Sequence, residues 1–79
     1  MYTLYVMSGC PYCAKVKEAV ERLHLAVEEK NIADSVASEE LENLGGVIQA
    51  PYLYDHEAQS GLYGSDKIVA YLEEHAAHA

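Results

Sequence analysis

Phenylalanine and tryptophan are both absent from the 79 residues, and seven tyrosines supply every aromatic side chain. Tyrosine must therefore fill core as well as surface positions, and we expect Tyr5, Tyr54 and Tyr71 to be packing residues. Basic residues are also scarce, because 5 Lys and Arg stand against 13 Asp and Glu, for a formal charge of −8. This balance argues against nucleic acid and anionic membranes as partners.

No apolar run is long enough to cross a membrane, and no basic or apolar leader precedes the first predicted strand. We therefore expect a cytoplasmic protein that does not associate with membranes. Internal repeats and low-complexity stretches are absent as well. The length predicts one domain over residues 1–79, near the lower limit for a self-sufficient core, and we expect a monomer.

Only two cysteines are present, and they form the motif Cys10-Pro11-Tyr12-Cys13. This spacing lets both thiols share the first turn of a helix and close a small disulfide. A structural zinc site would need four ligands, and no second pair follows at zinc-finger spacing. A static disulfide across so short a loop would stabilise little. The motif therefore indicates a redox-active pair.

The flanking residues predict the role of each thiol. Residues 4–7 form an apolar strand, residues 8–9 a turn, and Pro11 suits the first position of a helix. Cys10 then lies at the helix N-cap, where free N–H groups and the helix dipole favour a thiolate, so it is the predicted nucleophile. Cys13, one turn deeper, is the predicted resolving thiol.

Hydrophobic periodicity predicts three helices and four strands along the chain. The expected elements are strand 4–7, helix 11–24, an edge strand 26–32, a helix capped by Asp34 or Ser35 and ended by Gly45-Gly46, strand 47–54 interrupted by Pro51, strand 62–63, and a last helix capped by Ser65. Residues 38–40 offer an alternative start for the second helix. We expect Val36, Leu41 and Leu44 to face inward. The order β-α-β-α-β-β-α predicts an α/β thioredoxin-like fold, a four-stranded mixed sheet with helices on both faces.

Three segments, 10–13, 49–55 and 65–72, together resemble glutaredoxins, and the last two are similar to glutaredoxins allied to the N-terminal domain of glutathione transferases. Cys-Pro-Tyr-Cys is typical of the dithiol branch. The resemblance implies a glutathione-dependent thiol-disulfide oxidoreductase that reduces protein disulfides and glutathione mixed disulfides. Its partners would be glutathione, as co-substrate, and disulfide-containing or glutathionylated proteins, with no bound cofactor and no metal.

The resemblance also implies binding residues for glutathione. Ala50-Pro51 would be a cis peptide facing the nucleophile, with the Ala50 backbone pairing with the cysteinyl part of glutathione. Ser65 and Asp66 would hold the γ-glutamyl end at the start of the last helix. The remaining implied residues, Tyr12 and Gln49, would flank the groove.

Three positions depart from the family pattern. Met7 occupies the place where many glutaredoxins have a lysine, Gly64 replaces a Glu, and Val47 replaces a common basic residue. Fewer cations would then face an anionic substrate. Two alternatives stay open, an electron donor recycled by thioredoxin reductase and a carrier of a glutathione-ligated [2Fe–2S] cluster. His75 and His78 have the spacing of a metal pair, but histidines near a helix end also complement its dipole.

Overall fold

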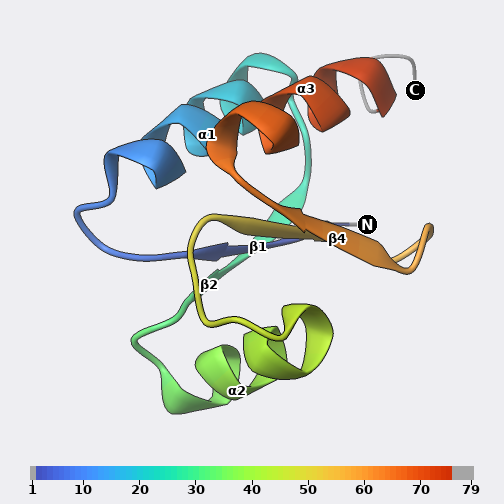
Figure 1. The fold of residues 1–79 in the computed structure, drawn as a ribbon. Helices are drawn as coiled ribbons and strands as arrows, with labels where there is room; N and C mark the ends of the chain where they lie inside the picture. Colours follow the sequence, from blue (N-terminus) through green and yellow to red (C-terminus); the bar gives the residue numbers. More distant parts are fainter. Residues whose placement is uncertain (1, 76–79) are drawn as a thin grey trace.

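The computed structural model describes residues 2–75, in which three helices and four strands follow the predicted order; His78 lies outside the described residues. The elements are β1 (Tyr2–Val6), α1 (Pro11–Arg22), β2 (Val27–Asn31), α2 (Ser35–Gly45), β3 (Tyr52–Asp55), β4 (Ser60–Tyr63) and α3 (Ser65–His75). The sheet order is β2-β1-β3-β4, with β1 and β2 parallel and the other neighbours antiparallel. Helices α1 and α3 cover one face and α2 the other (Figure 1). No helix within residues 2–75 is long and apolar enough to span a bilayer.

The two faces of the sheet are chemically different because side chains alternate along each strand. Beneath α1 and α3 the buried cluster is mainly aliphatic and consists of Leu4, Val6, Cys13, Val16, Leu53, Ile68 and Leu72. Beneath α2 the buried cluster consists of Tyr5, Ala37, Leu41 and Tyr52, with Ile32, Tyr54 and Tyr63 packed against it. The prediction that tyrosines serve in packing is thus confirmed for this face.

Helix α2 buries Leu41 as predicted, but it does not bury the other two residues that were expected to face inward. Asp34 caps its start by accepting a hydrogen bond from the Val36 N–H at 2.9 Å, as expected, and Gly46 ends it with φ of 88°. However, Ala37 and Leu41, four residues apart, face the sheet, whereas Val36 and Leu44 are 63% and 42% exposed. The small Ala37 side chain lets the helix lie close to the bulky tyrosine layer, so the prediction for Val36 and Leu44 was wrong.

The predicted strand over residues 47–54 is largely a loop. β3 begins only at Tyr52, because the ladder with β1 ends at the pair Tyr5–Tyr52 and the residues before Pro51 have no strand beside them. Pro51 also lacks the N–H that a ladder needs. The loop over residues 46–50 therefore connects α2 to β3 without belonging to the sheet.

Helix α3 begins one residue earlier than predicted. The Gly64 carbonyl accepts the first helical hydrogen bond, from the Ile68 N–H at 2.9 Å, so Gly64 occupies the N-cap and Ser65 the first helical position. Gly64 has φ of 94°, a conformation that glycine adopts without steric cost. The apolar side of α3 faces the core, because Ile68 and Leu72 are fully buried.

Candidate active site at the start of helix α1

The thiol pair lies where β1 leads into α1. Gly9, with φ of 76°, turns the chain, and Cys10 has extended dihedrals (φ −85°, ψ 116°) at the N-cap with Pro11 as the first helical residue. The Cys10 side chain is partly exposed, whereas Cys13 is only 2% exposed and belongs to the aliphatic core. One thiol is thus accessible and the other lies below the surface.

Electrostatics separates the two thiols. The backbone N–H and the thiol of Cys13, with a smaller contribution from the Tyr12 N–H, stabilise the Cys10 thiolate and lower the pKa of Cys10, although partial burial opposes this effect. The Cys10 sulfur makes no well-aligned capping bond, but attraction between an anion and N–H dipoles tolerates loose geometry. Burial raises the pKa of the Cys13 thiol, and its contact with Cys10 adds to this rise. Cys10 therefore ionises first.

A shallow hollow of about 350 Å³ adjoins the pair. It is lined by Met7, Ser8, Gly9, Cys10, Pro11, Cys13, Ala14 and Lys17. Met7 forms an apolar wall and is 48% exposed. Lys17 is the basic residue of this lining, and its ammonium pairs with Glu29 of β2 at 3.1 Å. The hollow thus offers little uncompensated positive charge to an anionic ligand.

The segment between α2 and β3 packs against the same core as the thiols. The Ala50–Pro51 peptide bond is cis, which confirms the prediction. Pro51 is buried, and Ala50 and Cys10 both pack against the same aliphatic core. The backbone before Pro51 lies outside the sheet ladder, so its N–H and C=O groups are available to pair with an extended peptide.

The remaining predicted residues lie around this centre at different depths. Tyr12 is 58% exposed on α1, and Gln49 is exposed in the loop over residues 46–50. Ser65 is 7% exposed, so its side chain is largely covered. Asp66 is exposed and lines a separate hollow of about 370 Å³ between α1 and α3, beside Lys15. None of these four lines the hollow next to Cys10. Their roles as glutathione ligands stay predictions.

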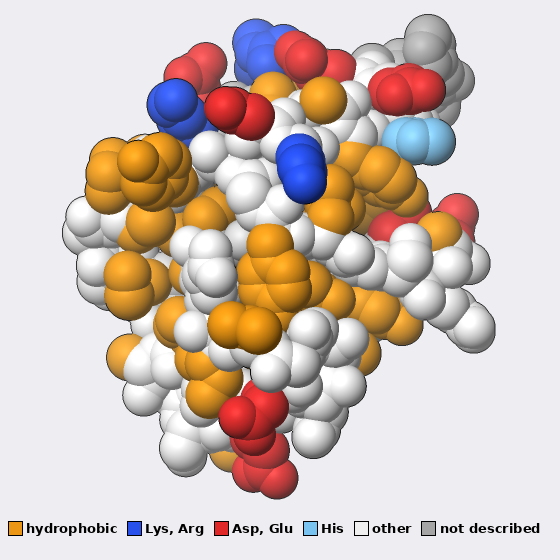
Figure 2. Space-filling view, viewed as in Figure 1, with side chains coloured by type: hydrophobic (Ala, Val, Ile, Leu, Met, Phe, Trp, Pro, Cys, Tyr) orange, Lys and Arg blue, Asp and Glu red, His pale blue; other side chains and the backbone are white. Residues whose placement is uncertain are grey.

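The exposed apolar side chains are not confined to the thiol pair. The large ones are Met7, Tyr12, Val36, Leu44, Val47 and Ile48. Apolar side chains occupy the middle of the face in Figure 2, between the α1 and α3 layer and α2, and the charged side chains lie nearer its margins. This face of the molecule is thus more apolar than the net charge of −8 suggests.

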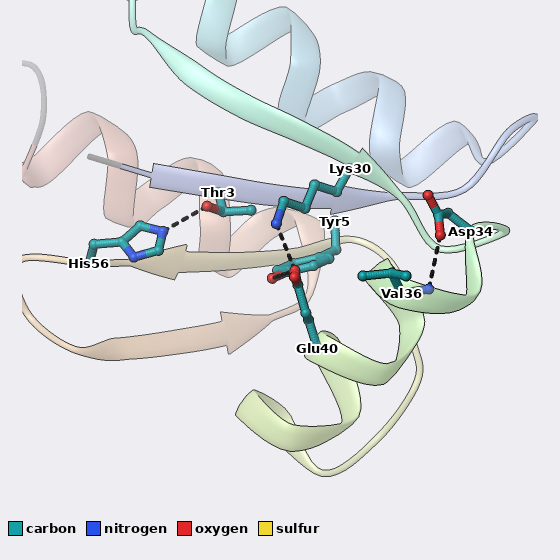
Figure 3. A network of polar contacts seen from close by, with 7 residues as sticks. All are labelled: Thr3, Tyr5, Lys30, Asp34, Val36, Glu40 and His56. Atoms are coloured by element: carbon teal, nitrogen blue, oxygen red, sulfur yellow. Dashed lines mark hydrogen bonds and ion pairs between the residues drawn. The ribbon is translucent and has the colours of Figure 1, made fainter.

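A third hollow, of about 410 Å³, was not predicted from the sequence. It lies on the tyrosine face of the sheet, which α2 covers only in part, away from Cys10. Figure 3 shows its polar groups pairing with one another: Glu40 accepts from Lys30 at 2.7 Å and from Tyr5 at 3.2 Å, and Thr3 bonds His56 at 2.7 Å. These groups fasten α2 and the β3–β4 turn to the sheet, so we assign the hollow no catalytic role.

Within residues 2–75, no cluster of three or more His, Cys, Asp or Glu side chains could hold a metal ion.

The fold is thioredoxin-like: the chain superposes on the thioredoxin-like protein BC3987 with a TM-score of 0.81 at 21% identity, over 94% of this chain and 97% of that one. Residues 4–79 match the family model of the glutathione S-transferase N-terminal domain. The chain therefore belongs to the glutathione S-transferase N-terminal domain family. The predicted alliance with these domains is confirmed, whereas the glutaredoxin assignment stays a prediction.

Two solved transferases illustrate the relation. A glutathione S-transferase from the Antarctic clam Laternula elliptica is 30% identical, with a TM-score of 0.76 over 92% of this chain and 34% of that one. Glutathione transferase E6 from Drosophila melanogaster is 27% identical, with a TM-score of 0.76 over 94% of this chain and 34% of that one. This chain thus spans about a third of the length of each transferase. No curated protein matches it.

Proposed function

We propose that this protein is a glutathione-dependent thiol-disulfide oxidoreductase that uses Cys10 as nucleophile and Cys13 as resolving thiol. The observation that carries the proposal is the pair itself: a partly exposed thiol with a lowered pKa at a helix N-cap, beside a buried thiol with a raised pKa. A protein that only bound glutathione would not need the second cysteine. The predicted reducing cytoplasm would supply glutathione as reductant.

The proposed reaction with a glutathionylated protein has two exchanges. The Cys10 thiolate attacks the glutathione sulfur of the mixed disulfide, the protein leaves as a thiolate that takes up a proton, and glutathione stays on Cys10. A second glutathione, as its thiolate, then attacks the glutathione sulfur of this adduct. The products are oxidised glutathione and the Cys10 thiolate, so each turnover consumes one free glutathione, and the other half of the oxidised glutathione comes from the substrate.

A protein disulfide would need both cysteines. Cys10 first forms a mixed disulfide with one sulfur of the substrate, and the other sulfur leaves. Cys13 then loses its proton and attacks Cys10, which releases the reduced substrate and leaves a Cys10–Cys13 disulfide. Two glutathione molecules reduce that disulfide. The raised pKa of Cys13 keeps this thiol protonated until the mixed disulfide has formed on Cys10.

Substrate alignment in the proposed site depends on the backbone before the cis-proline. An extended glutathione would pair with the free N–H and C=O of Ala50 and so bring its sulfur to Cys10. Asp66 and the N-terminus of α3 would receive the charged γ-glutamyl end. The proposed site therefore joins three chain segments around one apolar core.

The test compares wild type with Cys10→Ser and Cys13→Ser in the glutathione-dependent reduction of a glutathione mixed disulfide and of a protein disulfide. Cys10→Ser should abolish both reactions, whereas Cys13→Ser should abolish only the second. Ultraviolet titration of Cys13→Ser should show a Cys10 thiolate formed below the pH range of an ordinary thiol. Full reductase activity in Cys10→Ser would refute the proposal.

A transferase reaction at the same site is the second candidate, favoured by the 30% identity to the Laternula elliptica enzyme. Conjugation of glutathione to an aryl halide, measured on the same preparations, separates the two. Conjugation without disulfide reduction would favour the transferase. Turnover with thioredoxin reductase and NADPH but not with glutathione would instead identify a different electron source.

A further inference from the structure

The hydroxyl of Tyr63, at the end of β4, hydrogen-bonds to the backbone of the loop over residues 46–50. It donates a hydrogen bond to the Val47 carbonyl at 2.5 Å and accepts one from the Val47 N–H at 3.3 Å. Val47 lies outside every strand, so these two bonds replace those that a sheet neighbour would supply. A side chain on the last strand thereby fixes the main chain that leaves α2.

The Tyr63 ring is itself held in place. It packs on Tyr52 with ring centroids 4.5 Å apart, and it is partly buried at the margin of the tyrosine layer. Its hydroxyl end lies against Gly45, where an added Cβ would overlap the Tyr63 hydroxyl and the ring carbon that bears it. A glycine at this position is therefore what allows the hydroxyl to reach Val47.

Val47 is the last anchored point before the cis-proline. Gly46 still belongs to the end of α2, through the hydrogen bond of its N–H to the Glu42 carbonyl at 2.8 Å. Within the described part of the chain, no hydrogen bond holds residues 48–50 to another residue. The direction in which the chain leaves Val47 thus decides where Ala50 presents its backbone.

We propose that Tyr63 is a positioning residue for glutathione: its hydroxyl sets the loop so that the Ala50 backbone meets the substrate at Cys10. This inference rests on the proposed function and adds to it a residue in β4 that does not touch the reacting sulfurs. A loosened loop must be ordered again when substrate binds, which weakens binding but leaves sulfur exchange unchanged.

Tyr63→Phe is the direct test because it removes the hydroxyl and keeps the ring on Tyr52. We expect KM for a glutathione mixed disulfide to rise roughly two- to ten-fold, the range for loss of one well-formed hydrogen bond, because the second bond, at 3.3 Å, is long and weak; kcat and the Cys10 titration should be unchanged. Amide hydrogen exchange should become faster at Val47, whose N–H loses its acceptor. Tyr71→Phe is the matched control, because it also removes a hydrogen bond donated by a tyrosine hydroxyl. This bond goes to Asp55 at 2.6 Å and comes from α3, not from β4. The control variant should leave KM unchanged.

Gly45→Ala provides a second variant that keeps the hydroxyl but displaces it. It should raise KM as Tyr63→Phe does, and the double variant should raise KM less than the product of the two single effects, because both act on one contact. If wild type turns over and Tyr63→Phe keeps the wild-type KM, the inference fails while the proposed function stands. Absence of glutathione-dependent turnover in wild type would refute the proposed function and the inference with it, even if loop exchange became faster.

Discussion

Substitution of Met7 by lysine should improve the use of glutathione by adding a cation next to the thiol pair. Met7 lines the hollow beside Cys10, and its carbonyl accepts a hydrogen bond from the Cys10 N–H at 3.3 Å, so its backbone position is tied to the nucleophile. The basic side chain already in that lining, Lys17, is paired with Glu29. The positive charge of a lysine at position 7 would therefore be less neutralised than that of Lys17 and more available to a glutathione carboxylate.

The size of the gain follows from exposure. Met7 is 48% exposed, so an ion pair formed there would be solvated, and exposed pairs contribute about 0.2–1 kcal/mol. At 1.4 kcal/mol for each factor of ten, KM for a glutathione mixed disulfide should fall by roughly 1.4- to 5-fold. The gain should disappear in about 1 M salt, where the Debye length is about 3 Å.

The assay measures KM at low and high salt for wild type, Met7→Lys and Met7→Gln. Glutamine has a similar length without the charge, so it controls for loss of the thioether. The reasoning fails if the lysine variant keeps the wild-type KM at low salt, or if glutamine lowers KM equally.

Two further predictions concern stability. Gly61→Ala should destabilise the protein by about 1–3 kcal/mol, because the new Cβ would overlap the Tyr52 hydroxyl and ring. Replacing a glycine in a strand often has the opposite effect. Urea unfolding that shows equal or higher stability would contradict this prediction. Tyr71→Phe should cost about 1.5–3 kcal/mol, because it removes a hydrogen bond at 2.6 Å to the buried carboxylate of Asp55. That bond and those from the Ala58 and Glu57 N–H groups outweigh burial and hold the pKa of Asp55 below its usual value. The ionised Asp55 carboxylate therefore stabilises the folded protein above about pH 4, and this stabilisation is lost as the pH falls further. Between pH 6 and pH 2 the thermal unfolding temperature should therefore fall less in Tyr71→Phe than in wild type. An equal fall in both proteins would contradict the role of this bond.

Local sequence was sufficient for the thiol pair. A strand, a glycine turn, a proline at the first helical position and two cysteines in one helical turn involve neighbouring residues only, so their geometry follows from backbone rules. The order of the elements was predictable for the same reason, since periodicity and glycine or proline boundaries are local signals. The cis Ala50–Pro51 bond was predicted from a family resemblance, because a single X-Pro pair carries no signal of its isomer.

Tertiary packing decided what depends on residues distant in the chain. Val36 and Ala37 are both apolar, and only the tyrosine layer beneath α2 selects the smaller one for the interface. Residues 47–50 have strand-like composition, but β1 ends before it can pair with them, so they form a loop. The hydrogen bonds between Tyr63 and Val47 join residues 16 positions apart, and they form only when the β3–β4 hairpin folds back beside the end of α2. Such contacts arise when the sheet and its helices assemble, because only then do these side chains meet.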